Sequence, residues 1–279
     1  MDFSQFKPEI KRRFDLIQKR CRRYKDMGIV QQSIPAKILP RILVNDKYRV
    51  LFCLIPKVSA TTWRRMFLSM SGKVPKRRIF NLTNSEIFHK MYYFYDTLQN
   101  YDQEGVKIRL KNYTKVIFVR DPLERLLSAY RSKFVNTREF DQIYGARIIS
   151  NFRQNYTKIQ NTNSSTVTFL EFVKFVIDKE HIWFQKKNLH WSPYWDLCYP
   201  CTVNYDYIGK FENLVDEAND ILRYIGATKI QFPNRDLFYN ASKTKNVLNM
   251  YYSKIPQKYL ENISKRFKRD FNLFSYKFP

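Results

Sequence analysis

Short apolar runs alternate with amphipathic stretches along most of the chain. Residues 50–55 (VLFCLI) form a continuous apolar run that ends at Pro56, and residues 115–119 (KVIFV) form a second run. Runs of this length predict fully buried strands, because a half-exposed strand would alternate apolar and polar positions. Helical patterns follow both runs, over about 62–70 and about 122–134. Repeated strand–loop–helix units predict an α/β fold with a parallel sheet.

The junction after the second run carries its own signals for the start of a helix. Asp121 stands at the N-cap position, Pro122 at the first helical position and Glu124 where a capping-box acid belongs. Further helices are predicted over 8–27, 169–177, 214–225 and 256–274, with Gly226 as the C-cap of the third. Apolar residues recur at helical spacing after Pro122 and predict a face that packs on the sheet. They are Leu123, Leu126, Leu127 and Tyr130.

The composition adds an electrostatic argument. The chain of 279 residues holds 50 Lys and Arg against 25 Asp and Glu, a formal net charge of +25. A field of this size concentrates anionic partners such as nucleic acid, acidic polysaccharide, anionic lipid or a phosphorylated nucleotide. A solvated basic surface without a specific ligand is the alternative. Hydrophobic residues make up 44% of the chain, which is enough for a sizeable core and excludes a disordered tail.

The chain has four cysteines, two of which, Cys198 and Cys201, have CxxC spacing. No second CxxC or HxxxH accompanies this pair to complete a tetrahedral zinc site. A redox pair would stand at the start of a helix, whereas Pro200 lies inside this pair and a strand-like stretch, 205–208, follows it. The spacing therefore predicts a local disulfide between Cys198 and Cys201, or two packed thiols.

Two features bear on the cellular compartment. Asn-x-Ser/Thr sequons are more frequent than the roughly two expected by chance, which favours a secretory lumen, with an Asn-rich composition as the alternative. No apolar run is long enough to span a bilayer, and residues 1–9 hold no signal-peptide core. The two features agree if the chain is the soluble portion of a longer protein. The sequons lie at Asn81, Asn112, Asn155, Asn163, Asn240 and Asn262.

Residues 55–64 (IPKVSATTWR), at the end of the first predicted strand, have the layout of a phosphate-binding loop. Main-chain N–H groups at the start of a helix bind phosphate, hydroxyl groups add donors, and Lys57 adds a positive charge. The P-loop pattern of ATPases and kinases needs glycines and a lysine at its far end, and this segment has neither. The segment therefore argues against an ordinary ATPase or kinase, and a nucleotide kinase stays a rival that lacks the expected loop. The hydroxyl groups belong to Ser59, Thr61 and Thr62.

The second junction places Arg120 at the carboxyl end of a strand, where parallel sheets bind ligands. Ser128 lies two turns into the following helix, and Arg125 and Arg131 lie nearby. The two junctions together predict a site for two phosphates of one nucleotide. The alternative is an amphipathic helix with solvated arginines.

Both junctions resemble the donor-binding segments of sulfotransferases. Residues 56–63 resemble the 5′-phosphosulfate-binding loop, and residues 117–134 (IFVRDPLERLLSAYRSKF) resemble the 3′-phosphate-binding segment. The similarity is greatest to Golgi carbohydrate sulfotransferases related to the HNK-1, chondroitin 4-O- and dermatan 4-O- enzymes. Residues 53–65 (CLIPKVSATTWRR), 190–212 (HWSPYWDLCYPCTVNYDYIGKFE) and 270–276 (DFNLFSY) are similar to blocks of this family, so the resemblance covers roughly residues 10–278.

The resemblance implies a P-loop-like three-layer sandwich, with a central parallel sheet flanked by helices. It also implies one sulfotransferase domain over residues 1–279, with a helical N-terminal extension at about 1–45. The donor would be 3′-phosphoadenosine-5′-phosphosulfate (PAPS), without a metal. The acceptor would be a glycan hydroxyl, on an acidic polysaccharide such as chondroitin or dermatan, with no nucleic acid partner. The enzyme would work in the Golgi, with membrane attachment only through an N-terminal anchor that this chain lacks.

By the same resemblance, Lys57 contacts the 5′-phosphosulfate and stabilises the leaving oxygen, as charge stabilisation does in phosphoryl transfer. Residues 58–62 cradle it, and Arg120, Asp121 and Ser128 complete the donor site. The cradle residues are Val58, Ser59, Ala60, Thr61 and Thr62. Ala60 stands where the family usually has Cys, which removes one potential disulfide partner. The alternative that the chain is a family member without activity therefore stays open. Thr62 stands where the family usually has Asn.

The base that takes the acceptor proton is predicted among the three histidines, which are His89, His181 and His190. His190 ranks first because it lies in a family-like block, although a histidine beside a tryptophan is often structural. Glu86 and His89 are the other candidates. Trp63 lines the nucleotide site or belongs to the core.

A non-catalytic basic module that binds glycans or nucleic acid is the rival interpretation. It explains the net charge but not the paired junctions, and no RRM, KH, helix-turn-helix or zinc-finger pattern is evident.

Overall fold

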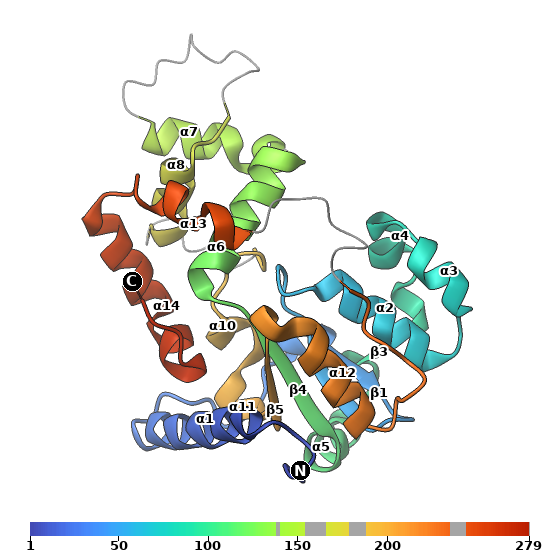
Figure 1. Ribbon diagram of the computed structural model, residues 1–279. Helices are drawn as coiled ribbons and strands as arrows, with labels where there is room; N and C mark the ends of the chain where they lie inside the picture. The colour runs from blue at the N-terminus through green and yellow to red at the C-terminus, as the bar shows by residue number, and fades with distance from the viewer. Residues whose placement is uncertain (138–139, 154–165, 179–187, 235–243, 279) are drawn as a thin grey trace. The chain divides into compact units, whose positions relative to one another are not determined.

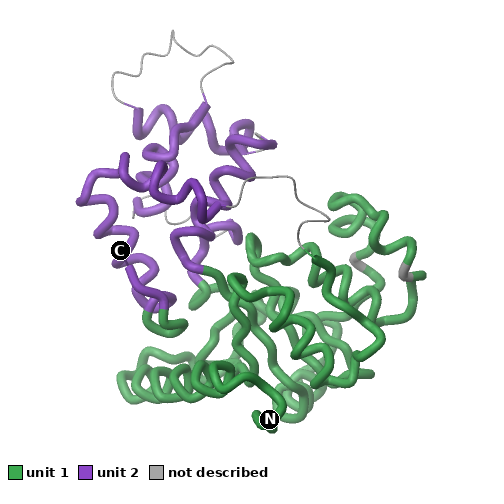
Figure 2. Tube along the Cα trace, in the orientation of Figure 1, with its two compact units in different colours: residues 1–120, 194–240, 272–275 green, residues 121–193, 241–271, 276–279 purple. Residues whose placement is uncertain are grey.

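The computed structural model describes residues 1–137, 140–153, 166–178, 188–234 and 244–278 (Figure 1). The chain divides into two compact units (Figure 2). The sheet unit contains residues 1–120, 194–240 and 272–275, and the helical unit contains residues 121–193, 241–271 and 276–279. The boundary between Arg120 and Asp121 divides the predicted 3′-phosphate segment between the two units.

The sheet unit is built on five strands in the order β3-β1-β2-β4-β5. Strands β2, β4 and β5 are neighbours and parallel, as predicted, whereas β1 is antiparallel to both β2 and β3. The sheet is therefore mixed, and the prediction of a parallel sheet is wrong for β1. The reason is the four-residue turn 46–49, which is too short for anything but an antiparallel hairpin. The strands are β1 (Ile42–Asn45), β2 (Val50–Cys53), β3 (Asp96–Thr97), β4 (Thr114–Val119) and β5 (Tyr207–Lys210).

Helices flank this sheet. Helices α1 and α12 pack against β5, and α2 packs against β1. The helices of the unit are α1 (Pro8–Asp26), α2 (Ala60–Ser71), α3 (Lys76–Asn81), α4 (Asn84–His89), α5 (Gln103–Asn112), α10 (Tyr194–Cys198), α11 (Pro200–Val203) and α12 (Leu214–Tyr224). Short 3-10 helices are η1 (Ala36–Arg41), η2 (Tyr92–Phe94), η3 (Leu98–Asn100) and η7 (Phe211–Asn213).

Helix α1, the predicted N-terminal extension, is part of the sheet unit. Its Arg13 is buried and donates through Nη1 to Oε2 of Glu217 at 2.7 Å and through Nη2 to Oε1 of Glu9 at 2.8 Å. Glu217 also accepts from the main-chain N–H of Lys210, at the end of β5. The buried charge of Arg13 is thus paired with carboxylates, as a buried charge requires, and the network fastens α1 to β5 and α12.

Two disulfides connect distant parts of the sheet unit. Cys21 of α1 pairs with Cys201 of α11, and Cys53 of β2 pairs with Cys198 of α10. The predicted local disulfide between Cys198 and Cys201 is therefore wrong, as is the alternative of two packed thiols. Both pairs close long loops, with sequence separations of 180 and 145 residues, so they restrict the unfolded chain strongly.

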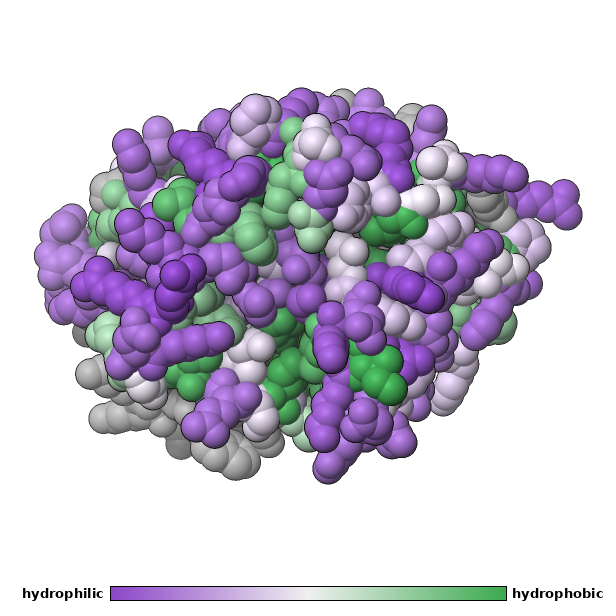
Figure 3. Space-filling model, turned by 90° about the horizontal axis from the view of Figure 1, so that it is seen from below, coloured by the Kyte–Doolittle hydropathy of each residue, from purple (hydrophilic) through white to green (hydrophobic). Residues whose placement is uncertain are grey.

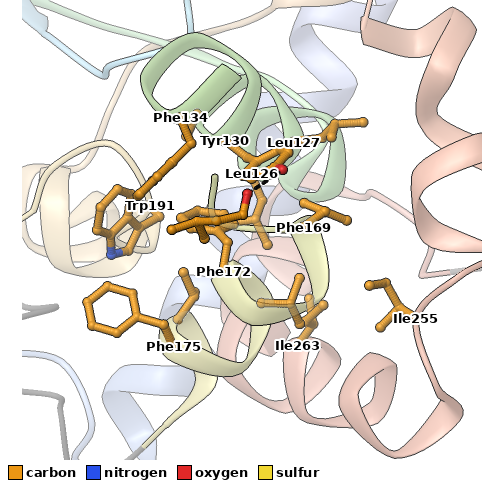
Figure 4. Packing of buried hydrophobic residues seen from close by; sticks show 14 of the residues in the cluster. Leu126, Leu127, Tyr130, Phe134, Phe169, Phe172, Phe175, Trp191, Ile255 and Ile263 are labelled. Atoms are coloured by element: carbon orange, nitrogen blue, oxygen red, sulfur yellow. Dashed lines mark hydrogen bonds between the residues drawn. The ribbon is translucent and has the colours of Figure 1, made fainter. Parts of the chain in front are cut away.

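The helical unit surrounds a core of aromatic and aliphatic side chains (Figure 4). Trp191, Phe172 and Phe175 are completely buried there, with rings from α8 packed on Trp191. Predicted helices are confirmed in α6, α8 and α14, although α6 gives way to a π-helical turn after Tyr130. The elements are α6 (Pro122–Tyr130), η4 (Arg131–Asn136), η5 (Asp141–Gly145), α7 (Ala146–Phe152), α8 (Phe169–Ile177), α13 (Thr244–Tyr252) and α14 (Gln257–Phe274), which ends in the sheet unit.

Candidate functional site

The loop between β2 and α2 holds a strained main chain. Lys57 and Ser59 have φ angles of 69° and 57°, in the left-handed region that residues other than glycine rarely adopt. Each such residue costs of the order of 1–3 kcal/mol, and the surrounding structure must hold it in place. Strain of this kind concentrates at ligand sites, so the loop has the backbone geometry expected of a binding segment.

Helix α2 begins without a side-chain cap. Ser59 is the N-cap residue, but its left-handed conformation leaves its side chain without a capping hydrogen bond. The first N–H groups of a helix have no partner within the helix, and they carry the positive end of the helix dipole. Those of Ala60, Thr61 and Thr62 are therefore donors for an anion. The Thr61 and Thr62 side chains are half-buried at the same helix end.

Arg120 lies beside this loop, at the end of the neighbouring strand β4. Its side chain is 3% exposed, and Nη1 donates to the main-chain carbonyl of Lys57 at 3.4 Å. The guanidinium also lies over the ring of Phe211, 4.4 Å from the centroid. The parallel pairing of β2 with β4 thus brings the two predicted donor-binding segments into direct contact within the sheet unit.

Tyr194, the first residue of α10, fixes the main chain of Arg120. Its fully buried hydroxyl donates to the carbonyl oxygen of Arg120 at 2.7 Å and accepts from its N–H at 3.0 Å. The last residue of the same helix, Cys198, is bonded to Cys53 at the end of β2. One short helix therefore holds the ends of both strands that precede the two candidate segments.

The third parallel strand, β5, ends in a basic residue. Lys210 pairs in register with Val119, the residue before Arg120. Burial and the Arg13 guanidinium lower the pKa of Lys210. Lys57, Arg120 and Lys210 thus follow or end three adjacent parallel strands, and they place positive charge along the carboxyl edge of the sheet, where such folds bind ligands.

The helical unit holds Asp121, Ser128 and His190. Asp121 caps α6, because its Oδ1 accepts from the N–H groups of Leu123 at 2.9 Å and Glu124 at 3.0 Å, and Pro122 occupies the first helical position as predicted. Ser128 is half-buried on α6. The capping role accounts for Asp121 without a ligand.

A buried arginine of the helical unit holds the main chain on both sides of His190. Arg125 is 1% exposed and donates through Nη1 to the carbonyl of Ser192 at 2.8 Å and through Nη2 to that of Leu189 at 3.1 Å. The His190 ring meets the ring of Phe140 edge-on, with centroids 5.5 Å apart. Arg125 is thus a structural residue rather than a solvated one.

The other candidate bases differ in their surroundings. Glu86 forms a capping box with Thr83 at the start of α4, and hydrogen bonds from the main chain and hydroxyl of Thr83 lower its pKa. A lower pKa makes a weaker base. His89 is exposed at the end of α4, in the same unit as Lys57. His181 lies outside the described residues. Trp63 is a core residue, 2% exposed, with its ring 4.3 Å from that of Phe52.

Sequence reasoning missed Tyr194, Phe211 and the pairing of Cys53 with Cys198. Tyr194 and Phe211 both lie in the family-like block 190–212, but each acts on Arg120 across at least 74 residues of sequence. Four cysteines allow three connectivities, and spacing alone does not select among them. The only signal for Tyr194 and Phe211 in the sequence was their place in the family-like block 190–212.

Among the described residues, no group of three or more His, Cys, Asp and Glu side chains is placed to hold a metal ion. No described helix is both long enough and apolar enough to cross a membrane. Of the sequon asparagines, Asn81, Asn112 and Asn262 are exposed, and the other three lie outside the described residues. Hydrophilic side chains predominate on the face shown in Figure 3, in keeping with the high charge.

Comparison with known proteins finds carbohydrate sulfotransferases that are similar to this chain over most of its length. Carbohydrate sulfotransferase 14 of Danio rerio is 38% identical over 245 residues, which cover 87% of this chain and 64% of the relative. Carbohydrate sulfotransferase 9 of Homo sapiens is 31% identical over 272 residues, covering 96% of this chain and 60% of the relative. Carbohydrate sulfotransferase 10 of Xenopus laevis is 32% identical over 283 residues, covering 96% and 76%.

The chain thus spans less than two thirds of the length of the first two of these relatives. No solved structure matches it. The family profile described as "Sulfotransferase family" matches residues 40–277, which include all the candidate segments in both units. The resemblance seen in the sequence is therefore confirmed, and the chain belongs to the sulfotransferase family.

Proposed function

We propose that the chain is the catalytic part of a carbohydrate O-sulfotransferase, with both units acting as one sulfotransferase domain. It transfers the sulfuryl group of PAPS to a glycan hydroxyl, on a glycosaminoglycan such as chondroitin or dermatan. The observation that carries this proposal is the contact between Arg120 and the uncapped, left-handed loop at Lys57. The names of the relatives support a carbohydrate acceptor.

The loop fits an anionic sulfuryl donor for a physical reason. Helix α2 offers unpaired N–H groups at its positive end, and a phosphosulfate is a polyanion with several acceptor oxygens. Lys57 neutralises charge on the oxygen that leaves the sulfur, and residues 58–62 donate to the other oxygens. Arg120 and Ser128 bind the 3′-phosphate. Phe211, against which the Arg120 guanidinium lies, keeps that arginine oriented.

A base must accept the proton of the acceptor hydroxyl as the new sulfur–oxygen bond forms. His190 is the first candidate by its place in the family-like block. His89 is the second, because it is exposed and belongs to the unit that holds Lys57. The variants His190→Ala and His89→Ala distinguish the two candidates. Loss of the base lowers kcat and removes the acid limb of the pH profile of kcat, whereas binding of the nucleotide product stays unchanged.

The covalent structure supports the proposal of a secretory compartment, such as the Golgi lumen. All four cysteines are paired, and disulfides persist in oxidising compartments rather than in the cytosol. The exposed sequon asparagines are compatible with glycosylation in that compartment.

The test is calorimetric titration with 3′-phosphoadenosine-5′-phosphate (PAP), the desulfated product, on wild type and on Lys57→Ala, Arg120→Ala and Lys111→Ala. Lys111 is an exposed lysine on α5 and serves as the control for a lost surface charge. We expect Arg120→Ala to abolish measurable binding and Lys111→Ala to leave it unchanged. A folded wild-type protein that does not bind PAP would refute the proposal and leave the basic binding module as the better account.

A further inference from the structure

An exposed aromatic cluster lies in the segment between α2 and β3. Phe88 is 40% exposed, Tyr93 is 85% exposed and Phe94 is 36% exposed, all within residues 88–94. Isolated exposed apolar residues are common, but a concentration of large exposed rings in one segment marks an interaction site. We refer to Phe88, Tyr93 and Phe94 as the aromatic cluster.

Two consecutive arginines of α2 hold this segment in place. The guanidinium of Arg64 lies over the ring of Phe88, 4.2 Å from its centroid. Arg65 is buried and donates through Nη2 to the carbonyl oxygen of Leu82 at 2.8 Å, just before α4. The capping box of Thr83 and Glu86 then fixes the first turn of α4. Phe88 is therefore presented by an ordered helix, and Tyr93 and Phe94 follow it in η2.

Arg64 also places Phe88 close to the candidate donor loop. Arg64 is the fifth residue of α2, so its Cα lies about 6 Å along the helix axis from the first residue, at 1.5 Å per residue. Phe88 is thus held beside the first two turns of the helix whose start is the proposed sulfuryl-binding site. An acceptor hydroxyl must lie near that helix start to attack the sulfur of the bound donor in line.

The charge of the segment indicates what binds there. Residues 72–94 contain one acidic residue, Glu86, against five basic residues, and Arg64 adds a further positive charge at Phe88. Aromatic rings with basic neighbours suit a chain of sugar rings that carries carboxylate groups. The apolar faces of the sugars pack on the rings, and the carboxylates pair with Arg and Lys. The basic residues are Lys73, Lys76, Arg77, Arg78 and Lys90.

We propose that the aromatic cluster and Arg64 form the acceptor subsite, which binds the sugar rings of an acidic glycan next to the donor loop. This inference rests on the proposed function for its reaction, and it adds the residues that select the acceptor. The segment belongs to the sheet unit together with Lys57 and Arg120. His89, between Phe88 and the two other rings, lies within the same subsite.

The test compares Phe88→Ala/Tyr93→Ala with Ile108→Ala, which removes a comparably exposed apolar side chain from α5 of the same unit. The probe is an unsulfated chondroitin oligosaccharide, titrated calorimetrically against each protein, with PAP titrated separately. We expect the double variant to bind the oligosaccharide about tenfold more weakly, with unchanged affinity for PAP. Ile108→Ala should match wild type, and Phe88→Trp, which keeps a ring over Arg64, should retain most of the affinity.

The outcomes separate this subsite from the proposed function. A double variant that binds the oligosaccharide as wild type does would overturn the subsite, as would a wild type that binds PAP but no oligosaccharide. If wild type binds no PAP, the proposed transferase is refuted. If the oligosaccharide then binds wild type but binds the double variant more weakly, the glycan subsite is still supported. Circular dichroism melting of each variant confirms that the compared proteins are folded.

Discussion

The two strand–loop–helix junctions of this protein satisfy their helix starts in opposite ways. At the start of α6, Asp121 caps two N–H groups with its own side chain and Pro122 removes a third donor. At the start of α2, the left-handed Ser59 leaves the helix end without a side-chain cap. The first junction in the chain therefore leaves the start of α2 without a side-chain cap, as the proposed donor site requires. The second satisfies its own backbone and offers the side chain of Arg120 instead.

The largest effect on stability is expected from the disulfide that anchors β2, next to the α2 junction. Cys53→Ser/Cys198→Ser should lower the free energy of unfolding by about 2–5 kcal/mol, because a cross-link over 145 residues is lost. Denaturant unfolding measures this change, and PAP titration measures how far the nucleotide affinity of the α2 junction depends on the disulfide. Cys21→Ser/Cys201→Ser is the matched control, since it removes a comparable cross-link elsewhere. Equal loss of PAP affinity in both double variants would contradict a specific role for Cys53 at the α2 junction.

Lys57→Ala should reduce sulfuryl transfer from labelled PAPS by about 10²- to 10³-fold, as expected when one stabiliser of developing charge is removed. PAP binding should fall less, because the α2 N–H groups remain. The exposed lysine variant Lys111→Ala supplies the baseline. If Lys57→Ala transfers sulfate at the wild-type rate, the α2 junction does not carry the chemistry.

Tyr194→Phe addresses the second junction. The variant removes the hydroxyl that pairs with both main-chain groups of Arg120, which should cost about 1–3 kcal/mol of stability. PAP affinity should also fall, because the Arg120 main chain loses its anchor. Tyr205→Phe is the control, since its buried hydroxyl donates to the carbonyl of Cys198 in the same unit. A loss of PAP affinity as large in Tyr205→Phe would show that general loosening, and not the position of Arg120, sets binding.

The smallest expected effects, from Asp121→Ala and Ser59→Ala, compare the two helix starts directly. Asp121→Ala should destabilise the protein by about 1 kcal/mol through loss of an N-cap, whereas Ser59→Ala should change stability by less than about 0.5 kcal/mol. For PAP affinity we expect the reverse order, with Ser59→Ala the weaker binder. Thermal melting and calorimetry on the same samples give both quantities. A destabilisation by Ser59→Ala as large as that of Asp121→Ala would mean that Ser59 caps α2 after all.

The hydrophobic pattern predicted the elements that carry the candidate site, because β2 and β4 are continuous apolar runs and α6 has strong local start signals. It did not predict β1, whose four residues are too few to show a period. Arg120, Lys57 and the loop were found because their chemistry is local in sequence. The hydroxyl of Tyr194 and the partner of Cys53 act across 74 and 145 residues, and no local pattern encodes such contacts.

The disulfide connectivity also sets an order of events during synthesis. Cys53 leaves the ribosome 145 residues before Cys198, a delay of roughly 7–30 s at ordinary elongation rates. Cys21 waits longer, for 180 residues. Within residues 1–197 the two early thiols have only each other as partners, and a bond between them would be non-native. In the proposed oxidising compartment, native pairing would therefore require an isomerase, or early strands that keep Cys21 and Cys53 apart until the CxxC segment arrives.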